Sequence, residues 1–296
     1  MDKPKKRLHL VPSILFSSLT PTRNKNMKQL LILSTFLLSM HLHAQVQRAP
    51  LQLGEQLTLH SEVLNEDRIL NVFLPQDYSD TASYPVLYVL DGSWHEDFIH
   101  ICGLVQFFNL QYAMPNMIVV GISNVDRKRD FTHHTDMPEM MEYIPTGGYS
   151  GAFISFLESE LLPVISGQYS TSGENWILGQ SLGGLLASEV LLNKPDLFSR
   201  YLIVSPSLWW DDESMLHRTG ELLKDQDLST LQVDISVGLD EHPTMVKDAA
   251  ALYESLSGLE NPPNTLRLNV MTGENHASIL HNAVYEALES WFPMEE

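Results

Sequence analysis

From residue 55 onward, short apolar runs typical of strands alternate with segments whose apolar residues recur at helical spacing. Such alternation predicts βαβ units and an α/β domain with a mostly parallel central sheet that helices cover on both faces. The predicted strands are Ile69–Leu74, Val86–Leu90, Met117–Gly121, Trp176–Leu178, Tyr201–Val204, Val233–Val237 and Leu266–Met271. The predicted helices are His95–Phe108, Phe153–Val164, Leu182–Leu192, Met245–Leu256 and Ala277–Trp291.

A polar stretch at about residues 124–148 interrupts this alternation. A long irregular insertion in a compact domain is usually functional or mobile. It follows the strand Met117–Gly121, so we expect it to emerge at the carboxyl edge of the sheet, where open α/β sheets bind ligands.

The N-terminal 44 residues read as a processing segment rather than as part of the fold. Residues 27–44 combine Lys28, an apolar stretch from Leu30 to Leu38 and the small residue Ala44. This is the pattern of a secretory signal peptide, and its apolar stretch is too short to span a bilayer. We therefore predict an extension with a signal peptide over 1–44, a catalytic domain over 45–296, a secreted or periplasmic location, and no membrane anchor after processing.

Composition excludes several classes of function. Apolar residues make up 44% of the 296 residues, enough for a sizeable core, and the formal net charge is −19. Such an acidic chain is not expected to bind nucleic acid, whose phosphates require clustered Lys and Arg. Cys102 is the only cysteine, so no intramolecular disulfide can form, and no zinc-binding motif occurs. We expect no metal and no cofactor.

The candidate nucleophile is Ser181. Residues 179–183 match the G-x-S-x-G nucleophile elbow, a sharp turn that presents a serine hydroxyl above a sheet. The predicted strand before it and the predicted helix after it supply the context that the motif requires. The free N–H groups at the start of that helix point toward any anion that forms at the serine.

The partners of this serine are expected in loops after later strands, in the order Ser, acid, His. His276 lies between the last predicted strand and the last helix, where it can take the serine proton. Asp240 and Glu241 follow the strand Val233–Val237, and either carboxylate can orient the imidazole. For the oxyanion hole we expect the Leu182 N–H and the Ser93 N–H, the latter free and pointing inward after an early strand.

With these pieces assembled, the chain resembles the Putative esterase family of α/β-hydrolases, which includes esterase D, enterochelin-type siderophore esterases, feruloyl esterases and mycolyltransferases. The resemblance covers roughly residues 55–293. It rests on these stretches: Val89–Gly92, Gly121–Asn124 with Arg127–Asp130, Phe156–Pro163, Gly179–Gly184, Ser205–Trp210 and Gly273–His276.

The resemblance implies an α/β-hydrolase fold and a serine esterase whose partner is a small-molecule ester. Ser181 and His276 carry over directly, and the acid carries over to Glu241, three residues after Gly238. Some siderophore esterases of the family lack a clear acid, so a Ser–His dyad stays open. Trp209 and Trp210 are expected to flank the site and to stack on substrate.

Three functions are compatible with these residues. The first is hydrolysis of a carboxylic ester, of siderophore type or with a small acyl group. The second is acyl transfer to an alcohol, as in the mycolyltransferases, which shares the chemistry as far as the acyl-enzyme. The third is a non-catalytic binding protein on the same fold, which the intact order of Ser, acid and His disfavours.

Overall fold

The structure is a computed structural model, and it describes residues 25–39, 47–111, 114–224 and 226–293. Residues 25–39 form the helix α1 (Lys25–Ser39), which covers most of the predicted signal peptide. The predicted cleavage point at Ala44 lies outside the described residues. The compact folded unit begins at Gln52 and continues through the rest of the chain.

The described part of this unit contains an eight-stranded sheet with the order β1-β2-β4-β3-β5-β6-β7-β8. β1 and β4 run antiparallel to β2, and every later pairing is parallel. This confirms the predicted mostly parallel sheet. The strands are β1 (Glu55–Ser61), β2 (Glu66–Phe73), β3 (Tyr84–Val89), β4 (Ile118–Ile122), β5 (Thr171–Gln180), β6 (Arg200–Val204), β7 (Gln232–Gly238) and β8 (Thr265–Met271).

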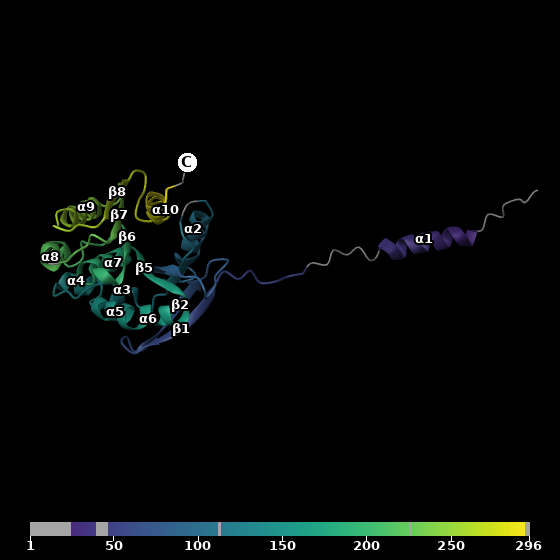
Figure 1. Cartoon of the computed structure of the whole chain (residues 1–296), viewed down its shortest axis with the longest axis horizontal. Coiled ribbons are helices and arrows are strands. Elements are labelled where there is room, and N and C mark those ends of the chain that lie inside the picture. Colours follow the sequence, from purple (N-terminus) through teal and green to yellow (C-terminus); the bar gives the residue numbers. More distant parts are fainter. Residues whose placement is uncertain (1–24, 40–46, 112–113, 225, 294–296) are drawn as a thin grey trace, which may run out of the picture. The chain divides into compact units, whose positions relative to one another are not determined.

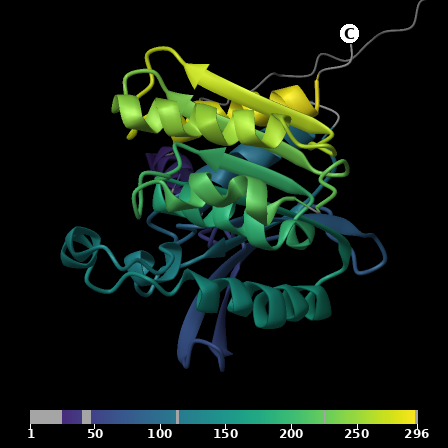
Figure 2. The same ribbon diagram turned by 90° about the vertical axis from the view of Figure 1, so that its left-hand side faces the viewer.

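Helices cover both faces of the sheet, as predicted. α2 and α10 lie together on one face, and the helices from α3 to α9 cover the other (Figures 1 and 2). The helices are α2 (Phe98–Gln111), α3 (Arg127–Phe131), α4 (Pro138–Tyr143), α5 (Ser150–Phe156), a π-helical turn (Leu157–Leu161), α6 (Leu162–Gln168), α7 (Leu182–Asn193), a 3₁₀ turn (Pro195–Leu197), α8 (Ser214–Leu222), α9 (Pro243–Ser257) and α10 (Ile279–Trp291).

The inner strands are apolar on both sides because both of their faces are buried. In β6, Tyr201 and Ile203 enter the core under α7, while Leu202 and Val204 enter the core under α2 and α10. All four side chains are at most 2% exposed. This double burial explains why the strands read as continuous apolar runs rather than as alternating ones.

The segment 124–148 is more regular than expected. It contains the short helices α3 and α4, and Figure 2 shows α4 extending from the domain at the lower left. Asp126 caps α3 by accepting a hydrogen bond from Arg129 N, and Pro138 opens α4. The segment is also fastened to the loop after β6, since Trp210 Nε1 donates to His133 O at 2.9 Å.

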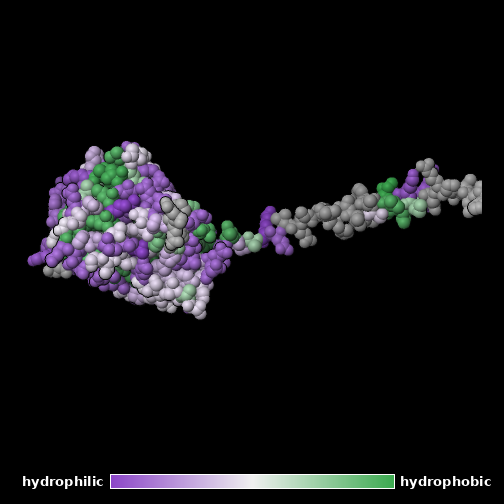
Figure 3. Space-filling view, turned by 45° about the horizontal axis from the view of Figure 1, so that its top comes forward, coloured by the Kyte–Doolittle hydropathy of each residue, from purple (hydrophilic) through white to green (hydrophobic). Residues whose placement is uncertain are grey.

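Most of the domain surface is polar. In Figure 3, purple hydrophilic residues cover most of the visible face of the domain, and green apolar residues gather in a strip at its upper left. Within the described residues, no helix is both long enough and apolar enough to cross a membrane.

Candidate active site

Ser181 stands at the one-residue turn between β5 and α7. Its φ of 60° and ψ of −119° are costly for a residue with a side chain. The turn is so tight that a Cβ on Gly179 would lie 2.2 Å from the carbonyl oxygen of Gly183. Ser181 N–H donates to Val204 O at 3.0 Å, which fastens the turn to β6. The strand, turn and helix predicted around the G-x-S-x-G motif are therefore present.

The loops after β7 and β8 bring a carboxylate and an imidazole together. Glu241 Oε2 lies 2.7 Å from His276 Nδ1, and the two side chains are 1% and 47% exposed. Asp240 makes no side-chain hydrogen bond within the described residues, and its N–H donates to Glu274 O at 3.0 Å. Of the two carboxylates that the sequence left open, Glu241 is the one that contacts His276.

The carboxylate of Glu241 is held by more than the imidazole. Its Oε1 accepts hydrogen bonds from Gly238 N at 2.8 Å and from the hydroxyl of Ser205. Burial by itself raises a carboxyl pKa, but the hydrogen bonds from His276, Ser205 and Gly238 outweigh it and hold the pKa of Glu241 below its ordinary value. The side chain is thus an oriented anion facing Nδ1, which leaves Nε2 of the imidazole to act as a base.

The loop that carries the base contacts the elbow that carries the nucleophile. Gln180 Nε2 donates to His276 O at 2.6 Å, which ties the histidine loop to the elbow. Ser181 Oγ lies 3.4 Å from Ser207 Oγ, and no hydrogen bond joins Ser181 to His276 in the part of the chain that the structure describes. Catalytic hydrogen bonds in free enzymes are often long and tighten when substrate binds.

The two amides expected at the oxyanion hole differ in whether they already donate a hydrogen bond. Leu182 N–H, at the start of α7, has no hydrogen-bond partner among the described residues. The expectation of a free Ser93 N–H was wrong, because this amide donates to Glu96 Oε2 at 3.4 Å. The sequence analysis assigned the Ser93 N–H to the oxyanion hole and did not consider the carboxylate of Glu96, three residues later, as an acceptor for it.

An ion pair joins this loop to the elbow. Arg127 Nε and Nη2 donate to the two carboxylate oxygens of Asp91 at 2.6 and 2.8 Å, and Nη2 also reaches Gln180 O at 3.2 Å. Asp91 has a φ of 55°, and its Oδ1 accepts a further hydrogen bond from Asn124 at 2.6 Å. Sequence reasoning gave none of these three side chains a role. The available signal was that Asn124 and Arg127 follow β4 at the same edge of the sheet.

The prediction that Trp209 and Trp210 both stack on substrate does not fit Trp210. Trp210 is 0% exposed and uses its indole N–H within the core, so it presents no surface to a substrate. Trp209 is only partly buried, and its ring centroid lies 6.2 Å from that of the exposed Tyr143 on α4. Both lie in the turn that follows β6, which directs the indole of Trp210 into the core and leaves that of Trp209 partly buried.

The described residues contain no group of three or more His, Cys, Asp or Glu side chains that is able to hold a metal ion. Cys102 is buried in α2, and burial raises the pKa of its thiol to about 12. The thiol is therefore protonated at neutral pH and is not a ready nucleophile.

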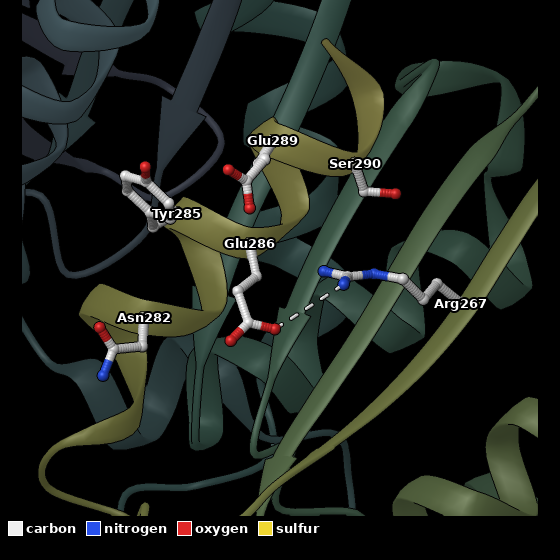
Figure 4. Close-up of a pocket in the computed structure, with 6 residues that line it drawn as sticks. All are labelled: Arg267, Asn282, Tyr285, Glu286, Glu289 and Ser290. Carbon is white, nitrogen blue, oxygen red and sulfur yellow. Dashed lines mark ion pairs between the residues drawn. The ribbon is translucent and has the colours of Figure 1, made fainter. Parts of the chain in front are cut away.

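The described residues also contain a cavity of about 390 Å³ between β8 and α10 (Figure 4). Arg267, Glu286 and Glu289 are among its lining side chains, and Arg267 forms an ion pair with Glu286. None of the candidate catalytic residues lines it. The elbow and the loops around it therefore remain the candidate site.

Comparison with known proteins agrees with this site. Residues 61–291 match the model of the family described as Putative esterase. The ferri-bacillibactin esterase BesA of Bacillus subtilis is 30% identical over 252 residues, which cover 76% of this chain and 85% of that protein. A siderophore triacetylfusarinine C esterase of Aspergillus fumigatus is 24% identical, over 82% of this chain and 94% of that protein.

Solved structures of relatives have the same fold. An IroE-like serine hydrolase from Shewanella oneidensis superposes with a TM-score of 0.71 at 30% identity, covering 81% of this chain and 80% of that one. The predicted α/β-hydrolase fold is thus confirmed, and the relatives are serine hydrolases and esterases. This chain belongs to the Putative esterase family and is an enzyme of the serine hydrolase class.

Proposed function

We propose that this esterase hydrolyses a siderophore-type ester through an acyl-enzyme on Ser181. The observation that carries the mechanism is the 2.7 Å contact between Glu241 Oε2 and His276 Nδ1, beside a serine held in a strained turn. The observation that favours the substrate is that two of the relatives carry siderophore esterase names.

In the proposed reaction, His276 Nε2 takes the hydroxyl proton while Ser181 Oγ attacks the ester carbonyl carbon. The Leu182 N–H stabilises the negative charge that develops on the carbonyl oxygen, together with the Ser93 N–H once that amide is released. Collapse of the tetrahedral intermediate breaks the bond to the leaving alcohol, which receives the proton from His276. Water then attacks the acyl-enzyme by the same steps, and Glu241 stabilises each imidazolium that forms.

A substrate panel tests the proposed class. We expect kcat/KM for a catecholate siderophore ester to exceed that for p-nitrophenyl butyrate and for a feruloyl ester by on the order of 10²-fold, because remote binding energy lowers the barrier. Hydrolysis is followed by chromatography of the acid that each ester releases. A panel in which the feruloyl ester is the best substrate contradicts the siderophore assignment. Ester products that accumulate only with added alcohol indicate acyl transfer instead.

We also propose that the protein is exported and that its mature N-terminus is Gln45. The supporting observation is the run from Met27 to Ala44, whose apolar part falls within α1. Expression with the native leader is expected to yield exported protein that lacks residues 1–44, measured by intact mass and N-terminal sequencing. Soluble cytosolic protein that begins at residue 27 or earlier contradicts the proposal.

A further inference from the structure

We propose that Glu96 occupies the Ser93 amide in the free enzyme and competes for it with the oxyanion that forms on the substrate's carbonyl oxygen during the reaction. The inference rests on the proposed esterase mechanism and adds to it a residue that sets the state of the oxyanion hole. Glu96 touches no reacting atom, so it is a positioning residue.

The first observation is a reciprocal pair of hydrogen bonds. Ser93 N–H donates to Glu96 Oε2 at 3.4 Å, and Glu96 N–H donates to Ser93 O at 3.1 Å. The spacing and the side-chain bond are those of an S-x-x-E capping box, here in the turn that leads into α2. The carboxylate therefore sits on the amide that the mechanism requires to be free.

The second observation is that this carboxylate is held loosely. Its bond to Ser93 is longer than the usual 2.9–3.0 Å of an N–H···O bond. Asn124 Nδ2 lies 3.5 Å from each oxygen of Glu96, but it makes its short bond, 2.6 Å, to Asp91. Since the side chain of Glu96 is also exposed, a substrate is able to displace it.

The third observation is the charge around the loop. Glu96 forms no ion pair within the described residues. Arg127, the cation beside it, donates from both Nε and Nη2 to the carboxylate of Asp91. The pKa of the neighbouring Asp97 is raised to about 6, first by burial and then by the charges of Asp91 and Glu96. An oxyanion that forms at Ser93 thus meets a like charge as well as a competitor for the same N–H.

This penalty acts on the tetrahedral transition states of acylation and deacylation. The full negative charge on the carbonyl oxygen exists in the transition state and not in the bound ester. An interaction that opposes only the transition state lowers kcat and leaves KM nearly unchanged. Removing the charge of Glu96 is therefore expected to raise kcat.

Two variants separate competition from a structural role. Glu96→Gln removes the charge and keeps an acceptor, while Glu96→Ala removes both. We expect both to raise kcat on p-nitrophenyl butyrate by about three- to tenfold, a range limited by solvent screening at an exposed site. KM should stay within about twofold, and an alkyl boronic acid, whose adduct with serine is tetrahedral and anionic, should bind correspondingly tighter. Glu254→Gln, the same change at an exposed position of α9, is the matched control and should alter none of these values.

Two results would overturn the proposal for Glu96. If Glu96→Ala lowers kcat and the melting temperature while Glu96→Gln leaves kcat unchanged, Glu96 only holds the turn and the proposal is wrong. Unchanged kcat and boronate affinity in both variants also overturn it. Failure of the esterase mechanism itself is read separately, from a Ser181→Ala variant that keeps its activity.

Discussion

Ser181→Ala is expected to lose covalent labelling by a fluorophosphonate and to lower kcat for ester hydrolysis by on the order of 10⁴–10⁶. The hydroxyl is the atom that forms the acyl-enzyme, and residual turnover can come only from binding and the oxyanion hole. The strained turn itself should persist, because alanine keeps the Cβ and the backbone. The measurements are labelling stoichiometry by intact mass and kcat on one activated ester.

Ser207→Ala is the matched control for this variant. Its hydroxyl lies 3.4 Å from Ser181 Oγ and is the nearest alternative nucleophile that the hydrogen bonds of the described residues reveal. The Ser207→Ala variant should still be labelled fully. Its kcat should stay within about tenfold of the wild-type value, because the change removes only one hydrogen bond next to the nucleophile. If Ser207→Ala abolishes labelling and Ser181→Ala does not, the nucleophile has been misassigned.

Glu241→Gln is expected to lower kcat by on the order of 10²–10³. The carboxylate accepts from three donors, His276 Nδ1, Gly238 N and Ser205 Oγ, whereas a glutamine amide turns an N–H₂ toward some of them. The imidazole then loses its fixed tautomer and the anion that stabilises its charged form. kcat is measured on one activated ester and on one siderophore-type ester.

Asp240→Asn removes the charge next to Glu241. It should lower kcat by less than about tenfold, since Asp240 has no side-chain hydrogen bond within the described residues. A larger loss for Asp240→Asn than for Glu241→Gln would reverse the roles of the two carboxylates. If neither change matters, the enzyme works as a Ser–His dyad.

The fold was predictable from sequence because its inner strands and large helices carry strong periodic signals. The apolar runs that became β3, β5 and β6 are buried on both faces. β1, with only Leu57 and Leu59 as apolar residues, was not predicted, and neither was α8. β1 has few apolar positions and is placed by its pairing with the next strand, β2. α8 is placed by its packing against α9, which lies beyond β7 in the sequence.

The candidate catalytic residues were predictable because each one follows a strand at the same edge of the sheet. What the sequence did not reveal was how neighbouring side chains pair. The contact of Arg127 with Asp91 joins residues 36 positions apart, and Glu96 reaches back to an amide expected to be free. Whether a tryptophan points into the core, as Trp210 does, likewise depends on packing that no local pattern encodes.

The most direct test of the account is the trapping of its covalent intermediate. Wild-type protein is mixed with a slowly deacylating activated ester, quenched in acid and examined by intact mass and peptide mapping. The account predicts a single acyl adduct on the peptide that contains Ser181, absent from Ser181→Ala. Ester turnover with no adduct on Ser181, or an adduct on another residue, would contradict it.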